Sequence, residues 1–271
     1  MIKLRNNFMR NITIYLLLML LVAGCSGSSE PEQETEPAEQ GPMFSEYLTC
    51  TPGSNFNADN VRAMIGDWNQ LDLPNLIYAA GHAPVAESSL GGEGKVYWQL
   101  FWESKELADE AWSQPPSEEF AAWGEKYADV LTCDGDGRRG YDAYWGRDND
   151  RSGEWADNSQ WVTYAHYCKF TEDGNLETLG AAAEAFNEYV DNSETGEDGP
   201  FTFAVYLHNG DNPEVYSQYD FFWMNYYQND EDAQSSYARF AENGGEMQAQ
   251  FDEISSCEGP YPSNSYQFLY E

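Results

Sequence analysis

Two kinds of apolar pattern alternate along the chain from Phe44 onward. Short apolar runs rich in aromatic and β-branched residues indicate strands, and apolar residues three and four positions apart, such as Val61, Ile65 and Trp68, indicate an amphipathic helix. The first half therefore predicts strand, helix, strand, strand, helix and strand, at residues 44–50, 58–71, 75–80, 95–103, 105–131 and 141–145. Two consecutive prolines, Pro115-Pro116, interrupt the second of these helices.

The second half repeats this order of elements. Its strands and helices are predicted at residues 161–168, 176–190, 201–208, 219–227, 231–256 and 265–270, with a break at Gly244-Gly245 in the last helix. Matching residues also keep their order in the two halves: Cys50 with Cys168, His82 with His208, Trp98 with Trp223, Trp102 with Tyr227, and Cys133 with Cys257. The pattern indicates an internal repeat of a βαββαβ unit, which is the ferredoxin-like arrangement.

The strand runs at residues 95–102 and 220–227 do not alternate between apolar and polar side chains, which is typical of sheets covered on both faces. Helices cover one face of a ferredoxin-like sheet, so the sheet of the other repeat is the simplest cover for the second face. In this respect the chain resembles the dimeric α/β-barrel superfamily, which includes antibiotic-biosynthesis-type monooxygenases and NIPSNAP-like proteins.

The resemblance to that superfamily is one of topology, without a diagnostic motif. It implies an α+β fold in which two tandem βαββαβ ferredoxin-like repeats pack sheet to sheet as a pseudo-dimeric α/β barrel. The first repeat is expected at residues 44–147 and the second at 161–271, with an acidic linker at 148–160 between them.

A further apolar stretch precedes the repeats. Residues 12–22 follow the basic residues Lys3, Arg5 and Arg10 and are too few to span a hydrocarbon layer of ~30 Å, which is typical of a secretory signal peptide. The stretch ends in Val22-Ala23-Gly24-Cys25, which resembles the bacterial lipobox. An ordinary signal peptide that contains a cysteine is the alternative.

The lipobox resemblance implies that residues 1–24 are a lipoprotein signal peptide and that Cys25 carries diacylglycerol and a further acyl chain such as palmitate. Ser26 follows the cysteine, which implies retention at the outer membrane of a cell envelope, facing the periplasm or the exterior. Residues 25–43 contain few large apolar side chains and are expected to form a disordered, acidic tether.

The four cysteines within the repeats allow three pairings, and an exported protein meets an oxidising environment. Each repeat holds one early and one late cysteine. The repeat therefore predicts the disulfides Cys50–Cys133 and Cys168–Cys257, each closing a long loop.

Acidic residues dominate the charge of the chain. It has 47 Asp and Glu against 13 Lys and Arg, which gives a net charge of −34. Such a surface repels the phosphate backbone, so we exclude a nucleic-acid-binding protein. The partners we expect are the membrane, through the lipid anchor, and a small-molecule or protein ligand.

The candidate catalytic residues are His82 and His208, which occupy matching positions near the start of a connection between strands. A polar cap at the end of a strand is the alternative role for each. His166 precedes Cys168 by two positions and is expected to be a packed, hydrogen-bonded residue. Haem-binding members of the superfamily hold iron through a helical histidine, whereas these three histidines are predicted in strands or turns, so the resemblance does not extend to haem.

Two further groups of residues are candidates for binding. An aromatic pocket is one hypothesis, and core packing is the alternative, for Trp98, Trp102, Trp223, Tyr226 and Tyr227. Asp148, Asp150 and Ser152 resemble the first half of a calcium loop, but Ser159 stands where an EF-hand has its bidentate Glu, so an acidic linker is the alternative. No cofactor is predicted other than this calcium.

These patterns favour a non-catalytic binding protein of the cell envelope, anchored by lipid. The alternative is an enzyme, a cofactor-independent monooxygenase-like or related small-molecule catalyst that uses the barrel cavity. A second alternative is a calcium-stabilised surface protein. No hydrolase, zinc-protease, phosphate-loop or dinucleotide motif appears in the sequence.

Overall fold

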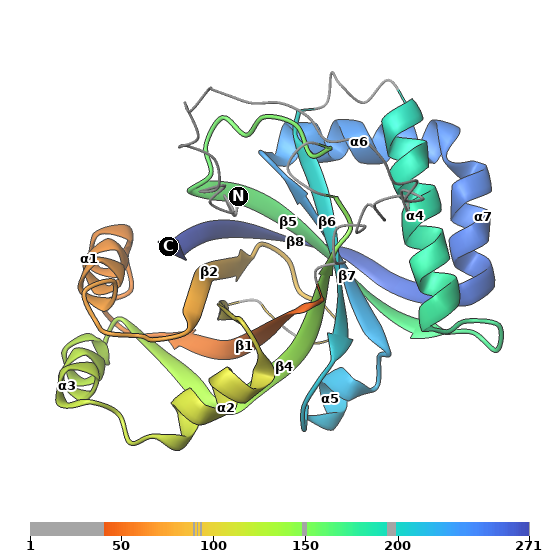
Figure 1. Cartoon of the computed structure of the whole chain (residues 1–271). Helices are drawn as coiled ribbons and strands as arrows, with labels where there is room; N and C mark the ends of the chain where they lie inside the picture. The colour runs from red at the N-terminus through yellow and green to blue at the C-terminus, as the bar shows by residue number, and fades with distance from the viewer. Residues whose placement is uncertain are drawn as a thin grey trace, which may run out of the picture. The chain divides into compact units, whose positions relative to one another are not determined.

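Eight antiparallel strands close into a barrel in the order β1-β3-β2-β8-β5-β7-β6-β4 (Figure 1). The structure, a computed structural model, describes residues 41–88, 90, 92, 94–147, 151–193 and 199–270. The first repeat supplies β1 (Met43–Pro52), α1 (Ala58–Trp68), β2 (Leu76–Pro84), β3 (Val96–Trp102), α2 (Lys105–Ser113), α3 (Glu118–Tyr127) and β4 (Leu131–Trp145). The second supplies β5 (Gln160–Phe170), α4 (Leu176–Asn192), β6 (Phe201–His208), α5 (Glu214–Ser217), β7 (Phe221–Tyr227), α6 (Asp230–Asn243), α7 (Gly245–Ile254) and β8 (Ser255–Tyr270).

The barrel consists of two four-stranded sheets joined at both edges. The first repeat has the strand order β4-β1-β3-β2 and the second β8-β5-β7-β6, which is the ferredoxin-like order in each. Pairing of β2 with β8 and of β4 with β6 then closes the barrel. The predicted fold, two tandem ferredoxin-like repeats forming a pseudo-dimeric α/β barrel, is confirmed.

The helices cover the outer face of the barrel in two separate groups, α1 to α3 over the first repeat and α4, α6 and α7 over the second (Figure 1). Polar side chains cap their first turns, for example Asn57 at α1 and Asn175 at α4. Inside the barrel, side chains from both repeats form one core, which includes Tyr47, Phe101, Tyr206 and Phe222 together with several small alanines that leave room for these rings.

Two predicted boundaries were wrong in the same way. The helices predicted to reach Leu131 and Ser256 end at Tyr127 and Ile254, and β4 and β8 begin almost at once. The reason is strand pairing: Cys133 lies opposite Cys50 on β1 and Cys257 lies opposite Cys168 on β5. Residues 134–140, which lie between the predicted helix and the predicted strand at 141–145, are therefore part of β4.

The structure contains the disulfides Cys50–Cys133 and Cys168–Cys257, which is the pairing that the repeat predicts. Each joins two residues directly opposite each other on neighbouring strands, at corresponding places in the two repeats. Each also fixes the start of the long last strand of its repeat to the first strand.

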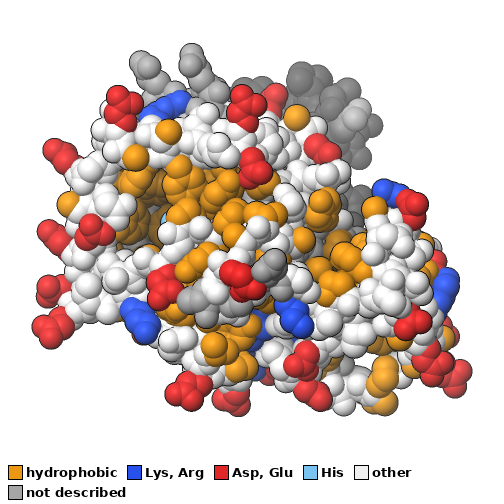
Figure 2. Space-filling view, turned by 180° about the vertical axis from the view of Figure 1, so that it is seen from behind, with side chains coloured by type: hydrophobic (Ala, Val, Ile, Leu, Met, Phe, Trp, Pro, Cys, Tyr) orange, Lys and Arg blue, Asp and Glu red, His pale blue; other side chains and the backbone are white. Residues whose placement is uncertain are grey.

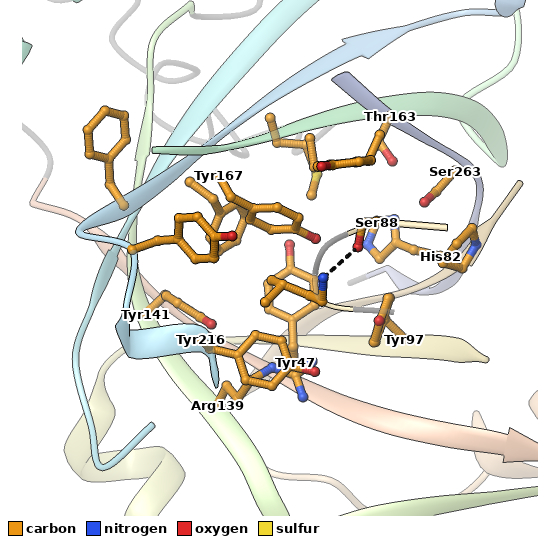
Figure 3. A pocket seen from close by; sticks show the side chains of 18 of the residues that line it. Tyr47, His82, Ser88, Tyr97, Arg139, Tyr141, Thr163, Tyr167, Tyr216 and Ser263 are labelled. Atoms are coloured by element: carbon orange, nitrogen blue, oxygen red, sulfur yellow. Dashed lines mark hydrogen bonds between the residues drawn. The ribbon is translucent and has the colours of Figure 1, made fainter. Parts of the chain in front are cut away.

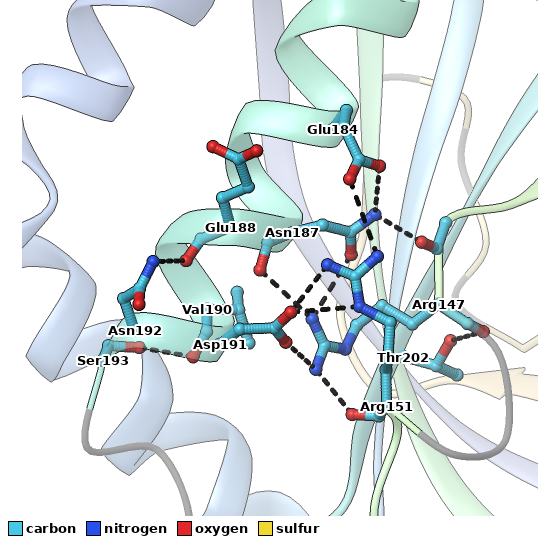
Figure 4. A network of polar contacts seen from close by, with 11 residues as sticks. Arg147, Arg151, Glu184, Asn187, Glu188, Val190, Asp191, Asn192, Ser193 and Thr202 are labelled. Carbon is cyan, nitrogen blue, oxygen red and sulfur yellow. Dashed lines mark hydrogen bonds and ion pairs between the residues drawn. The ribbon is translucent and has the colours of Figure 1, made fainter.

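The connection between the repeats is held against α4 by ion pairs (Figure 4). Arg147, directly after β4, is buried and donates to Asp191 Oδ1 at 2.8 Å, and Arg151 donates to Asp191 Oδ2 at 2.6 Å. Asn187, one turn earlier on α4, donates to the carbonyl oxygen of Gly146. These contacts fix both ends of the segment at 148–150, which lies outside the described residues.

Acidic side chains project over most of the surface that Figure 2 shows, and hydrophobic side chains are exposed in the hollows between them. The few lysines and arginines are scattered, in keeping with the net charge of −34. Within the described part of the chain, no helix combines the length and the hydropathy that crossing a membrane requires.

Candidate functional site

One cavity lies inside the barrel, at the end where β2 and β6 finish (Figure 3). We call it the barrel-end cavity. Its volume is about 70 Å³, and both repeats contribute side chains to it. His82 and His208, the two histidines that the repeat relates, both line it.

His82 is part of a buried polar network rather than a cap at a strand end, because β2 continues to Pro84. Its Nε2 lies 2.8 Å from Gln99 Oε1, and the amide nitrogen of Gln99 donates to Ser45 and Tyr206. This amide orientation requires the ring proton on Nε2, so Nδ1 accepts from the hydroxyl of Ser265 at 2.9 Å. Burial lowers the pKa of His82 to about 4, so the ring is neutral at pH 7.

His208 is also hydrogen-bonded at both nitrogens. Its Nε2 donates to the carbonyl oxygen of Tyr219 at 2.9 Å, and its Nδ1 accepts from the amide of Asn212 at 2.6 Å. Burial lowers the pKa of His208, although less deeply than that of His82. Neither candidate histidine therefore has a ring nitrogen left for a substrate in this structure.

The second cavity is larger, about 450 Å³, and lies between the sheet of the second repeat and the helices α4, α6 and α7. We call it the second-repeat cavity. Its walls are mainly aromatic, from Phe186, Tyr189, Phe201, Phe221, Trp223, Tyr227, Phe240 and Phe251. A mostly apolar cavity of this size with a few converging polar groups is the usual form of a small-molecule site.

Four side chains that line this cavity form one hydrogen-bonded chain. Trp223 Nε1 donates to Asn225 Oδ1 at 2.8 Å, and Asn225 Nδ2 donates to the hydroxyl oxygen of Tyr237 at 2.9 Å. The hydroxyl of Tyr237 lies 2.8 Å from His166 Nε2 and can donate its proton there, which places the ring proton of His166 on Nδ1. Burial lowers the pKa of His166 to about 4. Among the described residues, its Nδ1 has no hydrogen-bond partner.

The corresponding space in the first repeat is filled. Strand register pairs Leu48 with Trp98 in the first repeat and His166 with Trp223 in the second, so these positions match. Trp98 packs against Trp68, Trp123 and Phe268 at ring-centroid distances of 5.1, 6.2 and 4.8 Å.

Sequence reasoning missed this chain of polar residues, although a signal for it was present. His166, Asn225 and Tyr237 stand where the first repeat has Leu48, Leu100 and Trp112. Two matching positions on strands thus carry polar side chains in place of leucine, and a third on a helix carries Tyr237 in place of Trp112, whose Nε1 donates to Glu46. Side chains that differ in polarity at matching positions of a repeat mark the place where the two halves diverge.

The five aromatic candidates do not share one pocket. Trp223 and Tyr227 line the second-repeat cavity. Trp98 and Trp102 occupy the matching positions in the filled core of the first repeat, where Trp102 donates to the buried carboxylate of Glu46. Tyr226 points into the barrel, and its hydroxyl lies 2.6 Å from that of Tyr206.

The calcium candidates Asp148 and Asp150 lie outside the described residues, so calcium binding stays a prediction. Ser152 is buried and borders the second-repeat cavity. Among described residues, no group of three or more His, Cys, Asp or Glu side chains is placed to hold a metal ion. The second-repeat cavity also does not fit haem held by a helical histidine, because α4, α6 and α7 contain none and His166 lies on β5.

No protein-family model matches the sequence, and no curated protein matches it. Several solved structures are similar over most of their length. A putative monooxygenase from Lactobacillus acidophilus is 12% identical with a TM-score of 0.48, over 84% of this chain and 95% of that one. An anthrone oxidase-like protein is 10% identical with a TM-score of 0.49, over 84% and 92%. A chlorite dismutase variant from Candidatus Nitrospira defluvii is 11% identical with a TM-score of 0.47, over 84% and 92%.

Proposed function

We propose that this protein binds a flat, largely apolar small molecule in the second-repeat cavity. The observation that supports this proposal most strongly is the contrast at matching positions, where the first repeat fills the space with Trp98 and the second leaves about 450 Å³ beside Trp223. The aromatic walls favour a ring system, which stacks on such surfaces. The Nδ1–H of His166 favours a ligand with one hydrogen-bond acceptor, such as a carbonyl or phenol oxygen.

Native mass spectrometry of the purified protein, followed by titration with a panel of quinones, phenols and aromatic ketones, tests this proposal. A one-to-one complex that quenches tryptophan fluorescence is the expected result. Tyr237→Phe removes the hydroxyl that orients His166 and should weaken binding about three- to tenfold. Tyr144→Phe, which removes the hydroxyl of an exposed tyrosine that lines neither cavity, is the matched control.

If no aromatic compound binds, or if Tyr237→Phe and Tyr144→Phe bind equally well, the second-repeat cavity is not a ligand site. The double variant His166→Leu with Asn225→Leu gives an independent check, because it introduces the residues that the first repeat has at these positions. It should remove binding while the protein stays folded.

An enzyme that uses the same cavity is the second candidate function. It is favoured by one observation, the neutral imidazole of His166 beside the phenol of Tyr237 in an aromatic cavity. Such a pair can move a proton to or from a bound substrate, the first step by which a cofactor-independent monooxygenase prepares a substrate for molecular oxygen. Oxygen uptake in the presence of a bound phenol, lost in His166→Gln, supports this candidate. Binding of the phenol without oxygen uptake supports a non-catalytic binding protein instead.

We further propose that the protein acts at the cell envelope, anchored through Cys25. The sequence around this residue supports the proposal, since basic residues, a short apolar stretch and Ala-Gly-Cys occur in that order. Labelling of cells with an alkynyl palmitate analogue should mark the wild-type protein and leave Cys25→Ser unmarked. Equal labelling of both proteins contradicts the lipid anchor.

A further inference from the structure

The barrel-end cavity contains a buried cation without an acidic partner. Residues alternate along β4, so Arg139 shares the inner face of the barrel with Tyr141, and Arg138 points outward. Arg138 pairs with Glu46 at 3.0 Å. Arg139 is only 4% exposed, yet no carboxylate among the described residues lies within 4.0 Å of it.

The surroundings of Arg139 stabilise its charge only in part. Its guanidinium donates to Thr49 Oγ1 at 2.7 Å and also interacts with the hydroxyl of Tyr141, neither of which is a counter-charge. Its guanidinium also lies over the rings of Tyr216 and Tyr97, at 4.1 and 5.4 Å from their centroids. A buried cation without a counter-charge is destabilising, and these contacts offset only part of that penalty.

A second unpartnered group faces the same cavity. Tyr47 lies opposite Arg139 on β1, and its buried hydroxyl makes no hydrogen bond of ordinary geometry among the described residues, although the hydroxyl of Tyr206 lies near enough to affect its pKa (Figure 3). Burial raises the pKa of Tyr47, so this hydroxyl stays protonated at neutral pH and can donate. The cavity therefore presents a guanidinium without a counter-charge and a phenol O–H without a well-placed hydrogen-bond acceptor.

We propose that the barrel-end cavity binds a small carboxylate, with Arg139 as its charge partner and Tyr47 as a further hydrogen-bond donor. A guanidinium binds a carboxylate through paired N–H donors. The remaining walls include Ala165, Phe222 and Met224, which favour an organic acid with an apolar end over inorganic phosphate. A cavity of about 70 Å³ has room for roughly five or six non-hydrogen atoms, the size of propionate or pyruvate.

Calorimetric titration of the full chain with sodium propionate and sodium pyruvate, against sodium chloride at equal ionic strength, tests the proposal. Saturable one-to-one binding is the expected result for the wild type. Arg139→Gln should weaken it at least about tenfold, because a charge-assisted hydrogen bond is lost. Arg62→Gln, which removes an exposed arginine on α1, should bind as the wild type does.

Tyr47→Phe provides the test if Arg139→Gln fails to fold. Its hydroxyl is unpartnered, so the variant should be at least as stable as the wild type without ligand and should bind carboxylate about three- to tenfold more weakly. Absence of saturable binding to the wild type, tighter binding of phosphate, or undiminished binding by Tyr47→Phe each overturns the proposal. Tyr237→Phe should leave carboxylate affinity unchanged, which separates this site from the second-repeat cavity.

Discussion

The two repeats have the same fold but use the space between sheet and helices in opposite ways. In the first, Trp98 and its neighbours Trp68, Trp123 and Phe268 fill that space. In the second, the matching Trp223 forms one wall of a cavity of about 450 Å³. The fold therefore does not require a cavity at this place. Where one occurs, and polar side chains replace apolar ones around it, function is the simplest reason for the difference.

The largest expected effect concerns the disulfides, because each repeat contains one at a corresponding place. The two disulfides span sequence separations of 83 and 89 residues, so the chain-entropy model assigns each about 4–5 kcal/mol. Cys50→Ala with Cys133→Ala, and Cys168→Ala with Cys257→Ala, should therefore lower the free energy of unfolding by similar amounts in urea denaturation. If the two losses in free energy of unfolding differ by more than about 2 kcal/mol, the disulfides do not stabilise the two repeats equally.

Truncation of the two matching tryptophans tests whether the space beside Trp98 is filled while the space beside Trp223 is open. Trp98→Ala should cost about 3–5 kcal/mol in free energy of unfolding, because it leaves a new cavity in a filled core. Trp223→Ala should cost about 1–2 kcal/mol less, because part of its ring already faces empty space. Urea denaturation of both variants measures the difference. Equal losses would mean that the second-repeat cavity is filled in solution.

The pH dependence of stability should reveal His166, which stands where the first repeat has Leu48. The pKa of His166 is lowered to about 4 by burial, while that of the unfolded chain is near 6.5, so between these pH values only the unfolded state binds the proton. The contribution of His166 is thus complete above pH 6.5 and is lost as the pH falls towards 4. The loss is about 3 kcal/mol.

His166→Leu should remove this part of the pH dependence. Denaturation midpoints of wild type and variant between pH 7.5 and pH 4 provide the measurement, and the difference between the two curves cancels the titration of the acidic residues. His82 should still give the variant some loss of stability over the same range, because its pKa is also lowered to about 4. Parallel curves for the two proteins would contradict the burial of His166.

The smallest expected effect concerns the ion pairs beside the second-repeat cavity. Asp191→Asn removes the carboxylate that Arg147 and Arg151 share, and it leaves the buried Arg147 without a counter-charge. We expect a loss of about 1–2 kcal/mol, smaller than for a fully buried pair because Asp191 is partly exposed. The hydrogen bonds from both arginines lower the pKa of Asp191 despite its partial burial. The stability difference between the wild type and Asp191→Asn should therefore shrink as the pH falls and Asp191 becomes protonated. Thermal melts at pH 7 and pH 3 would measure both effects.

The architecture could be predicted from the sequence because it rests on local patterns and on the repeat. Strand and helix periodicity, together with the matching cysteines, were enough for the barrel and for the disulfide pairing. The starts of β4 and β8 could not be predicted, because residues 131–137 and 255–260 are rich in Asp, Ser, Gly and Pro, which is typical of turns rather than strands. There, pairing with β1 and β5 decides the structure, and that pairing is a tertiary contact.

The candidate site was predicted less well, for a related reason. His82 and His208 attracted attention as matching histidines, yet hydrogen bonds occupy both ring nitrogens of each. Tyr226 and Tyr227 are neighbours in sequence but face opposite sides of the sheet, and only the strand register reveals which side holds the cavity. Whether aromatic rings fill a space or surround it depends on helix placement, which residue patterns do not specify.

The closure of the barrel by β2–β8 and β4–β6 has an evolutionary consequence. In a dimer of identical chains these two seams would be copies of one another, and every substitution would appear on both sides of the symmetry axis. In the fused chain each seam is made once, so a single mutation alters one half and spares the other. One half can then remain a rigid support while the other accumulates the changes that a binding site needs. Fusion of the two repeats thus allows a division of labour that a symmetric homodimer does not.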